Sequence, residues 1–140
     1  MRTKERVKQT GEVFTPPELV EEILDKLPQE VWNDTEKTWL DPSCGNGNFL
    51  VAVKDRLLAR GRPLYEVLSK IYGVDIMQDN VDECRARLDP DNLYPDIVNN
   101  NIICADALRY HYRFDGSYSY DDEYEQIQKE EHLLKINIIY

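Results

Sequence analysis

The chain opens on a helical pattern of apolar residues. Within residues 16–27, apolar side chains recur at helical spacing, at Leu19, Val20, Ile23, Leu24 and Leu27. The pattern predicts an amphipathic helix with one face against a core. Thr15 is placed to cap this helix, with Pro16 at its first position and Glu18 reaching back. We therefore expect a capping box at its start.

Three short apolar runs, each ending in an acid, alternate with further helical patterns. The runs are residues 37–41, 71–75 and 101–106, and they end in Asp41, Asp75 and Asp106. Helical patterns follow the first two runs, up to Gly61 and over residues 77–88. This alternation predicts a parallel sheet covered by helices. The ligand crevice of such a sheet lies at the carboxyl ends of its strands.

Two further patterns follow Asp106. Aromatic residues alternate on either side of Asp115 and Gly116, at Tyr110, Tyr112, Phe114, Tyr118 and Tyr120, which predicts a β-hairpin. After a short helix within residues 121–134, the β-branched run at 136–140 suits a parallel strand. We expect an α/β fold: a mostly parallel sheet of about four strands plus a hairpin, with flanking helices.

Composition and charge narrow the class of protein. With 140 residues, 41% of them hydrophobic, and no apolar run near the length of a membrane span, we expect a soluble, cytoplasmic protein without a membrane segment. A net charge of −10 argues against a domain that binds nucleic acid without a partner. Three cysteines without metal-ligand spacing predict reduced thiols and no metal site.

Charge also divides the chain into two parts. Residues 1–10 form a basic arm, which is either a solvated tail or a segment that touches phosphate; its cations are Arg2, Lys4, Arg6 and Lys8. Residues 11–140 are expected to form a single domain.

The turn DPSCGNGNFL, residues 41–50, carries the most specific chemistry. Gly45 and Gly47 let a ligand approach the main chain at the start of a helix. The turn lacks both phosphate fingerprints, and Asp41 at its mouth would attract a cation. Asp75 is placed to accept from a ribose diol and Asp106 from an adenine amine. The alternative is that these acids only cap the following helices.

Four segments, in chain order, resemble the amino-terminal half of S-adenosylmethionine-dependent N6-adenine DNA methyltransferases of the restriction-modification type. They are GEVFTPPELVEEIL, WLDPSCGNGNFL, YGVDI and NIICADAL, within about residues 11–108. The resemblance implies a truncated, Rossmann-like class I methyltransferase fold with S-adenosylmethionine as cofactor. The cofactor-binding residues that it implies are Phe14, Thr15, Pro16, Asp41, Pro42, Cys44, Gly45, Gly47, Phe49, Asp75, Ile76, Asp106 and Ala107. It implies that Phe14, Thr15 and Pro16 flank the methionine part of the cofactor and that Asp41 and the glycine turn hold its amino acid end.

In that family an NPPY or DPPY motif just after the fourth strand binds the target amine, and no NPP or DPP sequence occurs in these residues. Two alignments stay open. In the first, residues 136–140 are the fourth strand, so that the chain stops where the motif begins. In the second, residues 137–140 are a degenerate form of the motif, with Asn137 at its start and Tyr140 at its end. The strand alignment is favoured by its β-branched residues.

Three functions compete. The favoured one is a cofactor-binding subunit, or half of a split methyltransferase, inactive by itself and dependent on a partner for DNA. A homo- or hetero-oligomer would then cover the edge of the last strand. The second is a non-catalytic binding or decoy module, suggested by the acidic residues 115–131. The third, consumption of S-adenosylmethionine by other chemistry, lacks a nucleophile or general base.

Overall fold

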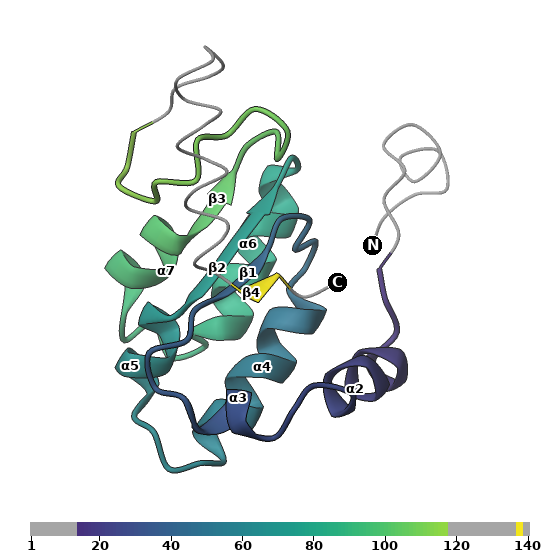
Figure 1. The fold of residues 1–140 in the computed structure, drawn as a ribbon. Coiled ribbons are helices and arrows are strands. Elements are labelled where there is room, and N and C mark those ends of the chain that lie inside the picture. Colours follow the sequence, from purple (N-terminus) through teal and green to yellow (C-terminus); the bar gives the residue numbers. More distant parts are fainter. Residues whose placement is uncertain (1–13, 118–136, 139–140) are drawn as a thin grey trace.

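The computed structural model describes residues 14–117 and the backbone of residues 137–138. Among these residues, four strands form one parallel sheet in the order β3–β2–β1–β4 (Figure 1). The strands are β1 (Trp39–Asp41), β2 (Ile71–Asp75), β3 (Ile102–Cys104) and β4 (Asn137–Ile138). The predicted α/β fold is confirmed, and β4 lies within the run predicted as the fourth strand.

Two helices precede β1 along the chain, two lie between β1 and β2, and two lie between β2 and β3. They are α2 (Pro17–Asp25), α3 (Glu30–Asn33), α4 (Asn48–Leu58), α5 (Leu64–Ser69), α6 (Gln78–Leu88) and α7 (Pro95–Asn101). The apolar periodicity predicted α2, α4 and α6. It did not predict α3, α5 and α7, which have four, six and seven residues and are too short to show a repeat.

One face of the sheet packs against the helices. Trp39, Ile71 and Ile102 point to this face, and every helix from α2 to α7 contributes buried apolar side chains to the same cluster. Trp32 of α3 stacks on Trp39, with ring centroids 4.8 Å apart. Such a pair adds about 1 kcal/mol beyond the burial of its area. The helices therefore fix the positions of β1, β2 and β3 from one side.

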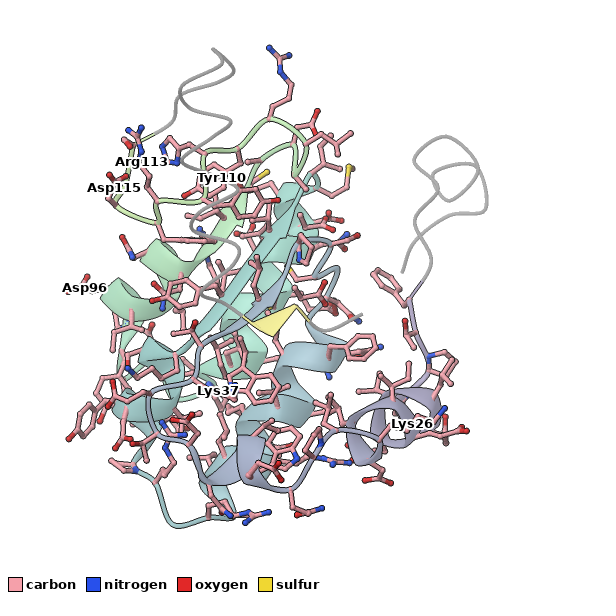
Figure 2. All side chains as sticks on the ribbon, in the orientation of Figure 1. Lys26, Lys37, Asp96, Tyr110, Arg113 and Asp115 are labelled. Carbon is pink, nitrogen blue, oxygen red and sulfur yellow. The ribbon has the colours of Figure 1, made fainter. Side chains whose placement is uncertain are left out.

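The opposite face is covered by the segment that the sequence predicted as a hairpin. That prediction is wrong for residues 110–114: Tyr110 makes only a single β-bridge, residues 111–114 form no strand, and Tyr112 and Phe114 have left-handed φ values of 58° and 50°. Both pack, with Tyr110, against the sheet residues Leu40, Val74 and Ile103. Figure 2 shows Tyr110 inside this loop, and Arg113 and Asp115 at its outer end.

Burial and side-chain acceptors explain why the aromatic alternation does not become a strand. The Phe114 N–H donates to the Tyr110 hydroxyl at 3.2 Å, and the Arg113 N–H donates to Nδ1 of His111 at 3.0 Å. These bonds replace the ladder of a hairpin. The alternating rings therefore reflect burial against the sheet face opposite the helices.

The predicted capping box is also wrong. Helix α2 begins at Pro17, with Pro16 as its N-cap and without a side-chain capping bond. Pro16 has φ −59° and ψ 147°, because the ring of a following proline excludes the helical region. Thr15 is therefore one residue too early to cap the helix, and its carbonyl takes another partner.

Several predictions lie outside the described residues. These are the basic arm at 1–10, the second half of the hairpin at 118–120, the helix within 121–134, most of the acidic segment, and Tyr140. Within the described part of the chain, a search for a helix long and apolar enough to cross a membrane finds none.

Candidate functional site

The three predicted acids lie at one edge of the sheet. Asp41 and Asp75 end the neighbouring parallel strands β1 and β2, and Asp106 follows the end of β3 by two residues. Asp41 is 2% exposed, and its Oδ1 accepts from the Ser43 N–H at 3.0 Å. Oδ1 of Asp106 accepts from the Leu108 N–H at 2.9 Å. The edge thus carries three carboxylates with fixed orientations.

Asp75 links β2 to the glycine-rich turn. Its Oδ1 accepts from the Gly45 N–H at 3.2 Å, and its Oδ2 accepts from the Met77 N–H and from Nδ2 of Asn80, both at 3.0 Å. Asn80 is fully buried. Because a carboxylate accepts about four hydrogen bonds, Asp75 retains capacity for a further donor. The sequence did not predict Asn80 as a site residue, because Asn80 lies within α6 and belongs to no recognisable motif.

The turn itself depends on its two glycines. Gly45 has φ +53°, and a Cβ built on it would lie 2.9 Å from Cε1 of Phe14. Gly47 has φ +96°, and a Cβ there would lie 2.8 Å from Sγ of Cys84. Both positions need the left-handed region and close approach, so other residues would be strained there. The ring of Phe14 therefore lies directly against the turn.

The cysteines near the turn are packing residues. Cys44 is 4% exposed and hydrogen-bonded to the Cys84 thiol, and this bond together with burial raises the pKa of Cys44 well above its ordinary value. Burial also raises the pKa of Cys104. Thiols with raised pKa values carry little thiolate at neutral pH, so they are weak nucleophiles. The three cysteines are free, as predicted.

The remaining predicted residues divide between the surface and the core. Ile76, directly after Asp75, is 61% exposed, whereas Phe49 is 7% exposed and belongs to the core under the helices. Pro42 is half-buried in the turn and Pro16 is exposed at the start of α2. The Ala107 carbonyl accepts from the Tyr112 hydroxyl at 2.6 Å. Phe49 and Cys44 are thus predicted site residues that pack in the core under the helices, and their contact with a ligand stays a prediction.

The register of β4 bears on the two alignments of the last residues. Asn137 pairs with Trp39 and Ile138 with Leu40, so Asn137 lies two positions before the level of Asp41. A residue at that level is inside the strand, whereas a group that binds the target amine would follow the strand's end. The register favours the strand alignment. The structure gives no side-chain position for Asn137, and Tyr140 lies outside the described residues.

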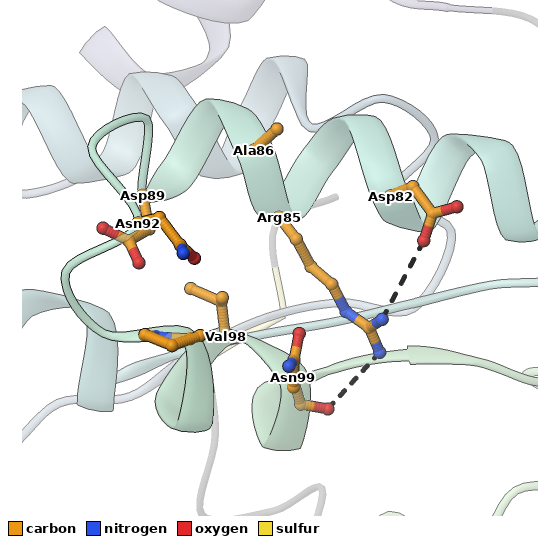
Figure 3. Close-up of a pocket in the computed structure, with 8 residues that line it drawn as sticks. Asp82, Arg85, Ala86, Asp89, Asn92, Val98 and Asn99 are labelled. Carbon is orange, nitrogen blue, oxygen red and sulfur yellow. Dashed lines mark hydrogen bonds and ion pairs between the residues drawn. The ribbon is translucent and has the colours of Figure 1, made fainter.

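A separate hollow of about 270 Å³ lies between α6 and α7 (Figure 3). Two of its charged side chains are already paired: Arg85 donates to the carbonyls of Ile102 and Asn99, and Asp89 accepts from the N–H groups of Leu93 and Tyr94. The hollow borders the last turn of α6, which runs away from the carboxyl end of β2. It is therefore distinct from the edge that carries the acids.

Comparisons with known proteins bear on the family of this chain. A family model described as N-6 DNA Methylase matches residues 1–112. The Type II methyltransferase M.VspI of Vibrio sp. (strain 343) is 34% identical over 110 residues, which are 77% of this chain and 23% of M.VspI. The chain thus spans less than a quarter of that relative's length.

Among solved structures, the ATP-dependent Type ISP restriction-modification enzyme LlaBIII, bound to DNA, aligns with 95% of this chain and 10% of its own chain. The sequence identity is 18% and the TM-score 0.49, a likeness too weak to argue from. The family match and the M.VspI alignment each cover most of the chain, and both include the turn and the acid-ended strands. The chain therefore belongs to the N-6 DNA methylase family.

Proposed function

We propose that these residues bind S-adenosylmethionine and form the donor half of an N6-adenine DNA methyltransferase. The observation that carries the proposal is the link between Asp75 and Gly45, which fixes the glycine-rich turn beside the second strand. The turn, Asp75 and Asp106 then meet at one edge of the sheet, where a parallel α/β fold binds its ligand. Family membership supports this cofactor.

The chemistry of the edge fits the parts of S-adenosylmethionine. A carboxylate with spare acceptor capacity, as at Asp75, suits the two hydroxyls of a ribose. The buried Asp41 carboxylate, at the mouth of the turn, suits the cationic end of the ligand. Asp106 and the exposed Ile76 suit the amine and the ring of adenine. The bound cofactor would supply an activated methyl group.

The acceptor half comes, in this proposal, from outside residues 1–140. Methyl transfer needs a target amine held in line with the methyl group and a base flipped out of the duplex. These residues contain no NPP or DPP sequence that would hold the amine. A further polypeptide segment or a partner subunit next to β4 would bring it, together with the surface that binds DNA. We expect no methyl transfer by the 140 residues alone.

Calorimetric titration of the 140-residue protein with S-adenosylmethionine tests the proposal. We expect saturable binding, and we expect Asp75→Asn to weaken it by about tenfold or more, since hydrogen bonds to charged groups contribute about 1.5–3 kcal/mol. Asp96→Asn is the matched control, because Asp96 is an exposed acid on α7. Absence of binding by the unaltered protein, or equal binding by Asp75→Asn, would disprove the proposal.

A further inference from the structure

Asn48 and Arg87 join three segments that are far apart in the sequence. Nδ2 of Asn48, at the start of α4, donates to the Thr15 carbonyl at 2.8 Å. Nη1 of Arg87, near the end of α6, donates to Oδ1 of Asn48 and to the Asn46 carbonyl, both at 2.9 Å. The two side chains therefore form a relay from α6 through the glycine-rich turn to the segment before α2.

The relay holds the segment that lies on the turn. Phe14 precedes Thr15, and Cε1 of its ring lies 2.9 Å from the position that a Cβ on Gly45 would take. Neither Phe14 nor Thr15 belongs to a helix or strand, since α2 begins only at Pro17. The bond from Asn48 to the Thr15 carbonyl thus helps to fix this short segment to the turn.

The far end of the relay is itself fixed. Nζ of Lys54, on α4, donates to the carbonyls of Arg87 and Leu88 at 2.9 and 3.3 Å, and Lys54 is 7% exposed. Helix α4 therefore holds the last turn of α6, while Arg87 on α6 holds the first turn of α4. This reciprocal arrangement leaves little freedom for the Arg87 guanidinium, which favours a positioning role.

We propose that Arg87 and Asn48 are positioning residues that hold Phe14 and Thr15 over the glycine-rich turn and so complete the subsite for the methionine end of S-adenosylmethionine. The proposal rests on the function proposed above. It adds that this subsite depends on two residues that do not touch the ligand. The nucleoside end, which depends on Asp75 and Asp106, does not depend on the relay.

Loss of the relay should free the segment and loosen the first turn of α2, without unfolding the rest of the helix. Arg56 of α4 donates to the carboxylates of Glu21 and Asp25 at 2.6 and 2.7 Å, so the middle and the end of α2 have a separate attachment. Asn48→Asp is the sharpest variant. It keeps the oxygen that accepts from Arg87, removes the donor to Thr15, and places a negative charge in the first turn of α4, where it stabilises a helix.

The chain offers a matched control pair. Nη1 of Arg60 donates to Oδ1 of Asn33, which repeats the Arg87–Asn48 contact between exposed side chains at the end of α3. Asn33→Asp and Arg60→Gln therefore introduce the same chemical changes as Asn48→Asp and Arg87→Gln, away from the turn. Each of the four variants is compared with the unaltered chain.

Two measurements test the relay. The first is hydrogen exchange without ligand at the Leu19 and Val20 amides, which donate to the Pro16 carbonyl. We expect faster exchange in Asn48→Asp and Arg87→Gln only. The second is affinity for S-adenosylmethionine and for 5′-methylthioadenosine, which lacks the amino acid end. We expect the first affinity to fall about tenfold, as for one lost hydrogen bond, and the second to stay unchanged.

The outcomes separate the two proposals. If the unaltered protein binds S-adenosylmethionine but the relay variants bind it equally well, the relay proposal is wrong and the proposed function stands. If both ligands lose affinity to the same extent, the relay has only a general structural role. If the unaltered protein binds neither ligand, the proposed function fails and the relay has no subsite to complete.

Discussion

Gly47 shows how strongly one residue can constrain the turn. Its φ of +96° costs a non-glycine residue about 1–2 kcal/mol, and a Cβ would lie 2.8 Å from the Cys84 Sγ inside the core. We expect Gly47→Ala to lower the free energy of unfolding, measured with urea, by more than this backbone cost. Gly61→Ala is the control, because Gly61 has φ +84° and nothing within 4 Å of a Cβ. Equal losses of unfolding free energy in the two variants would show that the Cys84 side chain moves aside without a free-energy cost.

At the scale of elements, the loop at residues 110–114 replaces the predicted hairpin and gives a pH dependence. Burial, with a smaller contribution from Asp106, raises the pKa of Tyr112 from 10.0 to about 12. The folded state keeps the phenol protonated, so this stabilisation is complete below pH 10 and is lost as the pH rises from 10 to 12. The hydroxyl also donates to the Ala107 carbonyl beside Asp106.

We expect Tyr112→Phe to cost about 1 kcal/mol at neutral pH for the lost hydrogen bond. Above pH 10, the stability of this variant should fall less steeply than that of the unaltered protein. Urea unfolding at a series of pH values measures both effects. Tyr65→Phe is the control, since Tyr65 is 55% exposed on α5. Parallel alkaline slopes for Tyr112→Phe and the unaltered protein would contradict the assignment.

The elements that the sequence predicted best are those whose local pattern agrees with their tertiary role. The strand Ile71–Asp75 was predicted with its observed bounds, because an apolar run that ends in an acid is typical of a buried parallel strand. The helix start at Thr15 and Pro16 was misplaced because the ring of Pro17 keeps Pro16 out of the helical conformation, so that the helix begins one residue later. The aromatic alternation was misassigned because rings at every second position also suit a loop folded onto a sheet face.

The candidate site shows the same division. The acids at the strand ends were predictable, since strand order alone brings them together. The relay was not, because Arg87 and Asn48 are 39 residues apart and only the crossing of α4 and α6 brings them into contact. Asn80 escaped prediction for a similar reason: its amide is recognisable as a site group only once the Asp75 carboxylate is seen beside it.

At the scale of the whole molecule, the net charge of −10 opposes binding of DNA by these residues. Duplex DNA binds proteins largely through phosphate contacts with basic groups, and repulsion between like charges grows as salt is removed. We therefore expect the 140-residue chain to leave duplex DNA unshifted in gel retardation at about 150 mM salt, and also at about 10 mM, where the Debye length is about 30 Å. A domain with its own DNA surface would bind more tightly at the lower salt.

The basic arm provides the decisive comparison for this prediction. If Arg2, Lys4, Arg6 and Lys8 form a solvated tail, deletion of residues 1–10 changes nothing at either salt concentration. If the arm touches phosphate, the full chain retards DNA at low salt and the deleted chain does not. The first result would support a DNA-binding surface outside these residues, because in the proposed function a donor half that repels DNA acts on it only when another segment supplies the attraction.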